Sequence, residues 1–368
     1  MIIDGHAYCF PPLSSPAGYP SLEEKMREFH QEMSGHHQPV WRVRDRAPAD
    51  NSTLVDLETK ELHDVEWKYG RQRFTWEYQG ETYTKQYFPP MLHNLECSPE
   101  LLLAEMDNIG VDMAILHTYP TLGRVNDFYA EAVASHPTRL MRLISLYDDQ
   151  IPGDPEAAAR EVEAQVAAGG RCGFQFIPRF YYLGGQTEPW DDGAMRPFWR
   201  ALAALGIPVY FTLGMGRSKG RDRSEDHEGY LNEHSILQRW MDRYPDLTVV
   251  LTHGLPWGSF LEDDRIVLPE AIWKIFDTPQ CHLQLLFPIG LGGRWEYPWL
   301  EAEPTVKECV QRIGADRLMY GTDMPMVARY CTYRQTLDQF RTHCDFLSDS
   351  ERQSIIGGTA ARVMGVGI

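Results

Sequence analysis

From about residue 98 onward, the chain alternates between amphipathic stretches and short apolar runs. The first amphipathic stretch begins with Ser98 and Pro99 and ends before Gly110, and its apolar residues recur every three or four positions. These features are typical of a helix with a side-chain cap, a proline in its first turn and a glycine stop. The apolar runs predict strands at residues 1–3, 112–117, 140–146, 172–177, 207–213, 247–252, 282–287 and 317–320.

The helical segments complete a repeating order of strand and helix. We expect helices near residues 99–109, 125–136, 155–169, 193–205, 231–243, 269–276, 304–313 and 348–364. Eight strands that each lead into helical sequence indicate a closed (β/α)8 barrel. We therefore predict an α/β fold, a distorted TIM barrel, that occupies residues 1–368 as a single domain.

Residues 11–97 interrupt this order because they separate the first strand from the first clear helix. They contain two alternating runs, residues 73–78 and 81–87, joined by Gln79 and Gly80. This pattern predicts a β-hairpin inside a long insertion after strand one. Loops that follow barrel strands emerge at the C-terminal face, so we expect the insertion to cover the active site or to meet a partner. A smaller insertion with a basic patch is expected at residues 214–228.

The composition narrows the class of protein. Apolar residues make up 43% of the chain, and nowhere do 18 of them run together without a charge, so we expect a globular protein that is neither secreted nor inserted in a membrane. The formal net charge of −17 repels phosphate backbones, which makes nucleic acid an unsuitable partner. Seven scattered cysteines without a CxxC pair favour reduced thiols in a cytoplasmic protein.

Catalytic groups of barrel enzymes lie where the strands end at the C-terminal face. Polar residues at these ends are therefore the candidates for a functional site, and we expect several of them to share one pocket. They are Asp4, His6 and Tyr8 on strand one, His117 on strand two, Gln175 on strand four, Thr212 on strand five, His253 on strand six and Asp323 on strand eight.

Four short motifs carry a family resemblance. They are IIDGH at residues 2–6, VVLTHG at residues 249–254, DRLMYGTDMP at residues 316–325, and a last segment that runs from SDSE at residues 348–351 to GTAAR at residues 358–362. In this order and spacing they resemble the amidohydrolase superfamily, in the branch that includes aminocarboxymuconate-semialdehyde decarboxylase. The resemblance covers nearly the whole chain apart from the insertion.

The resemblance implies a divalent metal ion held at the C-terminal face. By position, His6, His253 and Asp323 match family metal-site residues, and His253 and Asp323 also match the groups that move protons. Two positions depart from the family pattern. Tyr8 stands where a second strand-one histidine is usual, and Thr212 stands where a histidine usually ends strand five. The resemblance thus implies that two of the usual metal ligands are replaced.

Three hypotheses remain open for this site. In the first, His6, His253 and Asp323 form a rearranged site for zinc, iron or manganese, with Tyr8 or His117 nearby. In the second, Asp323 and His253 act as base and acid without a metal. In the third, the site is degenerate and is kept because the fold serves as a subunit. The structural alternative for His6 and Asp323 is a hydrogen-bonded pair that closes the barrel.

The neighbouring polar residues also keep two interpretations. We expect Tyr8, His117, Gln175 and Thr212 to line a pocket. The alternative for His117 is a structural, hydrogen-bonded histidine, and Tyr8 and Thr212 can equally fill the space left by the replaced imidazoles.

These hypotheses lead to two functions. The first is a metal-dependent enzyme, related to amidohydrolases, that acts on a small organic acid or amide by hydrolysis, decarboxylation or metal-dependent oxidation. The second is a paralogous subunit with a degenerate site, which forms a hetero-oligomer with an intact relative. In either case we expect a small-molecule substrate within a homo- or hetero-oligomer of related barrels.

Overall fold

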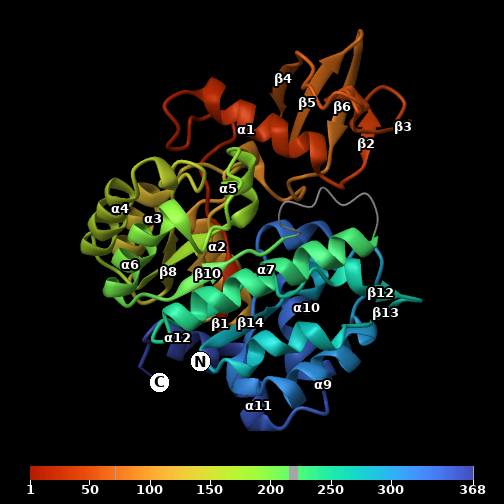
Figure 1. Ribbon diagram of the computed structural model, residues 1–368. Helices are drawn as coiled ribbons and strands as arrows, with labels where there is room; N and C mark the ends of the chain where they lie inside the picture. Colours follow the sequence, from red (N-terminus) through yellow and green to blue (C-terminus); the bar gives the residue numbers. More distant parts are fainter. Residues whose placement is uncertain (71, 215–222, 368) are drawn as a thin grey trace.

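The computed structural model describes residues 1–70, 72–214 and 223–367. Across these residues, eight parallel strands form one sheet in the order β1-β7-β8-β9-β10-β11-β14-β15, which confirms the predicted barrel (Figure 1). The strands are β1 (Ile3–Ala7), β7 (Met113–Leu116), β8 (Leu140–Ile144), β9 (Cys172–Phe176), β10 (Val209–Phe211), β11 (Val249–Leu251), β14 (Cys281–Leu285) and β15 (Leu318–Tyr320). Strand one was expected at residues 1–3, but it extends to Ala7, so Asp4 and His6 lie within it.

The barrel closes between β1 and the segment that follows β15. The Tyr8 amide donates to the Met324 carbonyl at 2.7 Å, and the Asp323 amide donates to the His6 carbonyl at 2.8 Å. An isolated parallel bridge between Ala7 and Met324 belongs to the same junction. We call this junction, residues 4–8 and 318–324, the seam. Two of the predicted site residues, His6 and Asp323, therefore lie on its two sides.

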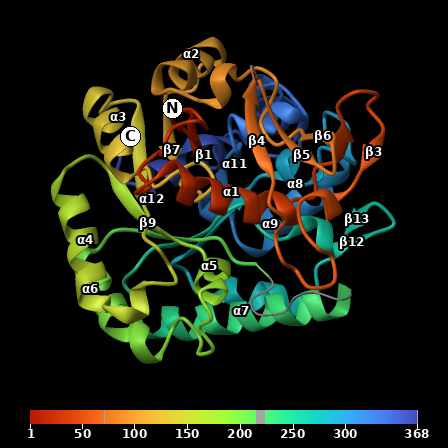
Figure 2. The ribbon, with the colours of Figure 1, turned by 90° about the horizontal axis from the view of Figure 1, so that it is seen from above.

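Helices surround the barrel, as Figure 2 shows from above. Ser98 caps the first of them by accepting from the Leu101 amide, and Gly110 ends it in the left-handed conformation with φ of 79°. The helices are α2 (Pro99–Ile109), α3 (Asn126–Ser135), α4 (Pro155–Ala167), α5 (Pro178–Leu183), α6 (Arg196–Leu205), α7 (Arg223–Arg243), α8 (Phe287–Leu291), α9 (Glu303–Arg312), α10 (Tyr333–Asp338), α11 (Asp349–Gln353) and α12 (Thr359–Val363).

Two expected helices differ from the prediction. The segment near residues 269–276 is a 3-10 helix, Glu270–Asp277. The last helix is not continuous, because a π-helical segment, Ser354–Gly358, separates α11 from α12. A Cβ atom at Gly357 would lie 2.4 Å from the Met1 carbonyl oxygen, so this turn passes directly against the start of the chain.

The insertion after β1 forms a separate layer at one end of the barrel (Figure 1). Its described part contains α1 (Leu22–Gly35) and an antiparallel sheet in the order β3-β2-β6-β5-β4. The sequence indicated only the hairpin of β5 and β6, in which Gln79 and Gly80 form the turn with φ of 51° and 78°. The strands are β2 (Val40–Arg42), β3 (Pro48–Ala49), β4 (Glu66–Gly70), β5 (Arg73–Tyr78) and β6 (Glu81–Lys85).

Several other expectations concern the chain as a whole. The basic side chains expected at residues 214–228 lie outside the described residues. The seven cysteines are free thiols, in keeping with the scattered pattern. Within the described ranges, no helix combines the length and apolar content of a membrane-spanning segment. The treatment of residues 1–368 as a single domain stays a prediction.

A buried lysine fixes α1 to the inserted sheet. Lys85 ends β6 and is only 2% exposed. Its ammonium group donates to the carbonyl oxygens of Met33 and His36 at 2.5 and 2.8 Å and to Oδ1 of Asn51 at 2.7 Å. A buried cation is tolerated when hydrogen-bond acceptors surround it. These bonds hold the C-terminal end of α1 in place.

We expect Lys85→Met to lower the free energy of unfolding by about 2–4 kcal/mol, because it leaves buried acceptors without a donor. Urea denaturation measures this loss. Lys68→Met is the matched control, since Lys68 lies on β4 of the same sheet and pairs with Glu77 between side chains that are 49% and 44% exposed. Such a pair contributes less than about 1 kcal/mol. Equal losses in the two variants would contradict this account of Lys85.

Candidate functional site

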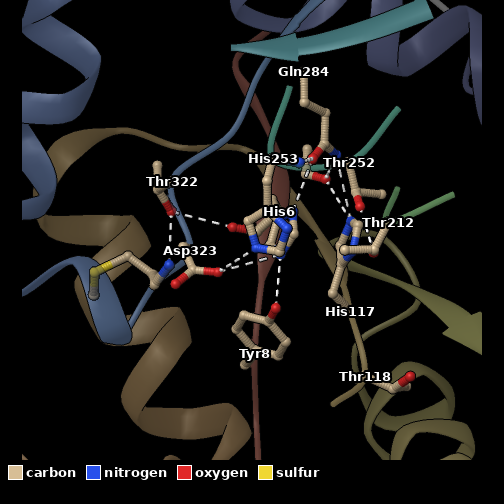
Figure 3. Close-up of polar contacts among 12 residues, drawn as sticks. His6, Tyr8, His117, Thr118, Thr212, Thr252, His253, Gln284, Thr322 and Asp323 are labelled. Carbon is tan, nitrogen blue, oxygen red and sulfur yellow. Dashed lines mark hydrogen bonds and ion pairs between the residues drawn. The ribbon is translucent and has the colours of Figure 1, made fainter. Parts of the chain in front are cut away.

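Three predicted residues converge at the C-terminal end of the barrel strands (Figure 3). His6 comes from β1, His253 follows β11 and Asp323 follows β15. Nε2 of His253 lies 3.1 Å from Oδ1 of Asp323, and Nε2 of His6 lies 3.4 Å from the same oxygen. One potential ligand atom from each residue falls within 4.8 Å of the others. The geometry suits a single metal ion or a shared proton.

Two of these three residues have a strained backbone conformation, which sets the direction of their side chains. His253 and Asp323 have φ of 60° and 69°, values that few residues other than glycine adopt. Gly254 continues the turn after His253 with φ of 80°, and a Cβ atom there would lie 2.4 Å from the Trp257 ring. The His-Gly pair therefore lets the chain turn sharply after β11. Strain of this kind is concentrated at functional sites.

Gln284, near the C-terminal end of β14, determines which nitrogen of His6 carries the proton. Its side-chain nitrogen donates to the Gly5 carbonyl at 2.6 Å, which fixes the orientation of the amide. Its oxygen then accepts from Nδ1 of His6 at 2.8 Å and from the His253 amide at 3.1 Å. His6 therefore carries its proton on Nδ1 and presents the lone pair of Nε2. The Tyr8 hydroxyl donates to this lone pair at 2.8 Å.

The charge state of His6 suits a metal ligand. The side chain is fully buried, and burial together with the nearby His117 and His253 holds its pKa well below the usual value. The ring is therefore neutral near pH 7. A cation bound by Nε2 of His6 and Oδ1 of Asp323, which lie 3.4 Å apart, would take the place of the Tyr8 hydroxyl as the partner of the His6 lone pair. Two neutral imidazoles and a carboxylate are a known ligand set for zinc, iron and manganese.

His117 follows β7 and Gln175 lies on β9, and both are buried in the barrel. The His117 ring stacks on His6 with centroids 3.6 Å apart, and its Nε2 donates to the Gly5 carbonyl at 2.9 Å. Its Nδ1 is buried and has no partner in the part of the chain that the structure describes. Gln175 accepts from the Thr118 amide at 2.9 Å. Their assignment as pocket residues stays a prediction.

The two positions that depart from the family pattern have defined contacts. Tyr8 donates to His6, and Oγ1 of Thr212 lies 2.5 Å from Oγ1 of Thr252. Both Tyr8 and Thr212 line a pocket of about 230 Å³, together with His253 and Asp323. That they replace metal ligands stays a prediction.

The insertion contributes residues that strand-end reasoning missed. Glu32, His36, His37 and Tyr87 from the insertion line the same pocket, as does Arg329 from the loop after β15. Only the His36-His37 pair directly after Gly35 gave a signal in the sequence, because two adjacent imidazoles follow the end of a helix. Gln284 gave none, since it lies within an apolar strand.

Comparison with known proteins identifies the family to which this chain belongs. Residues 35–366 match the sequence profile of the amidohydrolase family, so the chain belongs to that family. It is 28% identical over 229 residues to gamma-resorcylate decarboxylase from Polaromonas sp. strain JS666, a match that covers 56% of this chain and 66% of the relative. The corresponding enzyme from Rhizobium sp. strain MTP-10005 is 26% identical over 226 residues, covering 55% and 64%. The chain thus spans slightly less than two thirds of these relatives.

Solved structures share the fold. The 2,6-dihydroxybenzoate decarboxylase from Rhizobium superposes with a TM-score of 0.53 and 20% identity, over 74% of this chain and 90% of that one. A dihydroxybenzoic acid decarboxylase from Polaromonas sp. JS666, with bound manganese and 2-nitroresorcinol, gives 0.50 and 22%, over 72% and 85%. At these identities the likeness establishes the barrel and no more.

The ligand set can be tested by metal content. We expect about one divalent ion per chain in the wild-type protein after equilibration with manganese or zinc, and loss of that ion in His6→Ala and Asp323→Asn. Inductively coupled plasma mass spectrometry measures both metals. His343→Ala is the control, because His343 pairs with Tyr297 at an exposed position outside the pocket. Full occupancy in the two site variants would rule out this ligand set.

The role of Gln284 can be tested separately. We expect Gln284→Leu to weaken metal affinity about 10- to 100-fold, because Nδ1 of His6 loses the acceptor that orients the ring. Competition with a chromophoric chelator gives the affinity. Gln175→Leu makes the same chemical change on β9, where the amide contacts Thr118 rather than His6. A similar loss in both variants would show that the effect is general to the barrel interior.

Proposed function

We propose that this chain is a metal-dependent decarboxylase of small aromatic acids. One observation carries the proposal: Nε2 of His6, Nε2 of His253 and Oδ1 of Asp323 converge within 4.8 Å, with the lone pair of His6 facing Asp323. The curated relatives are gamma-resorcylate decarboxylases, which supports decarboxylation ahead of the other reactions expected from the sequence.

The pocket wall supports an aromatic substrate. Tyr87, Tyr119, Leu122, Ile289 and Met326 surround the space beside the ligand set with aromatic and aliphatic groups. At about 230 Å³, the pocket is suited to a single substituted ring rather than to a polymer. Apolar walls also remove water from the acid, which strengthens electrostatic interactions with it.

His6 and Asp323, with His253, would hold the metal ion. We propose manganese, because a related decarboxylase structure contains it. A bound divalent ion supplies Lewis-acid polarisation of substrate oxygens. His6 is held for this role by Gln284, and burial keeps it neutral.

His253 and Asp323 would supply the proton that decarboxylation requires. The bond between the ring carbon and the carboxyl carbon breaks, carbon dioxide leaves, and the ring carbon retains the electron pair and takes a proton. His253 takes one of these two roles, metal ligand or proton donor, at a time, because its Nε2 cannot bind a metal ion while it donates to Oδ1 of Asp323 at 3.1 Å; the side chain is 33% exposed. The pair can therefore hold a proton at the edge of the pocket.

We expect the manganese-loaded protein to release carbon dioxide from 2,6-dihydroxybenzoate and to form resorcinol. His253→Asn should lower kcat at least about 100-fold, because the proton donor is lost, while metal content falls less than in His6→Ala. Carbon dioxide release gives kcat, chromatography identifies the product, and metal analysis gives the metal content. His343→Ala again serves as control.

The rival functions give different results in the same experiment. Formation of a hydrolysis product from an ester or amide would identify the protein as a hydrolase. Consumption of dioxygen would identify a metal-dependent oxidation. Activity that appears only after an intact relative is added would favour the degenerate-subunit hypothesis. No turnover of any aromatic acid by the metal-loaded protein would overturn the proposal.

A further inference from the structure

One cation of the pocket, Arg329, forms no ion pair with the side chains that the structure describes. Arg329 lies at the end of the 3-10 helix Met326–Arg329, which follows β15, and it lines the same pocket as His253 and Asp323. Its Nη1 donates to the Tyr87 carbonyl, whereas its Nε is buried without a partner among the described residues. Among the side chains of residues 1–70, 72–214 and 227–367, no carboxylate forms an ion pair with the guanidinium. A buried N–H group without an acceptor is rare and costly in a native protein.

The insertion brings a second donor to this pocket. His36 follows α1, and its Nδ1 accepts from the Gln38 amide at 3.3 Å. Burial, followed by the charges of His37, Arg329 and Lys85, lowers the pKa of His36 to about 2. The ring is therefore neutral and carries its proton on Nε2. In the part of the chain that the structure describes, this N–H has no protein acceptor.

The two carboxylates of the pocket have other partners. Glu32 accepts from Arg179 at 3.1 Å, and Asp323 contacts His253 and His6. Neither Glu32 nor Asp323 forms an ion pair with Arg329. A guanidinium group at a site with apolar walls binds carboxylates strongly, because its planar N–H groups match the two oxygens.

We propose that Arg329 and His36 form an anion subsite that binds a second acidic group of the substrate. The carboxylate that leaves would bind at His6, His253 and Asp323, and the second acidic group would bind at Arg329 and His36. The substrate class is then an aromatic dianion, such as a ring with two carboxylates. This inference rests on the proposed decarboxylase function.

The test compares ligands that differ in one carboxylate. Isothermal titration of the manganese-loaded full chain uses benzoate and the three benzene dicarboxylates, phthalate, isophthalate and terephthalate. We expect at least one dicarboxylate to bind about 10- to 100-fold more tightly than benzoate, as a charge-assisted contact provides. Arg329→Gln should remove most of this preference and leave the affinity for benzoate within about twofold.

Three further variants separate binding from folding. Arg329→Lys keeps the charge and should retain part of the preference. Arg341→Gln removes the same charge from an arginine that pairs with Asp338 outside the pocket, and it should change nothing. Unchanged melting temperatures and benzoate affinity would show that Arg329→Gln is folded. His36→Leu should weaken dicarboxylate binding less than Arg329→Gln, since it removes an uncharged donor.

Each outcome decides the proposal. An Arg329→Gln variant with the wild-type preference, or a wild-type protein that prefers none of the dicarboxylates, overturns the anion subsite. Carbon dioxide release from a monocarboxylate without any dianion preference overturns the subsite and leaves the proposed function standing. A preference for dianions that depends on Arg329, without decarboxylation of any acid, supports the subsite and overturns the proposed function.

Discussion

The close approach of β1 to β15 is the constraint on which both the barrel and the site depend. A Cβ atom at Gly5 would lie 2.6 Å from Sδ of Met319, and one at Gly321 would lie 2.9 Å from Cβ of His6. Only glycine at these positions lets the two strands approach so closely. The seam then closes through hydrogen bonds, and those bonds place His6 and Asp323 3.4 Å apart. Closing the barrel and assembling the candidate ligands are thus one structural event.

Hydrogen bonds within the barrel convert this proximity into chemistry. The Gly5 carbonyl accepts from both Gln284 and His117, so the glycine that permits close packing also orients the groups on either side of His6. Gln284 in turn holds His6 and the His253 backbone. A buried imidazole without such partners would have either nitrogen protonated. The network selects the form in which a lone pair faces the carboxylate, which a metal ion or a shared proton requires.

The sequence predicted the barrel and the three converging residues because both depend on short-range patterns. Apolar runs separated by capped helices determine strand order, and residues at strand ends must meet at one rim. The insertion was harder to predict, since the helix α1 carries many polar residues and its position depends on contacts made by Lys85. Gln284 and Arg329 were missed for a related reason. Their importance comes from unsatisfied or shared hydrogen bonds, and these exist only in three dimensions.

The bond from Arg329 to the Tyr87 carbonyl joins a barrel loop to the insertion, and Lys85 joins the inserted sheet to α1. The pocket wall that contains His253 and Asp323 therefore comes from the barrel. The wall that contains His36 comes from the insertion. Substitutions in residues 11–97 can alter the outer wall without moving the seam. The fold thus lets one part of the substrate-binding wall change while the candidate ligands stay in place.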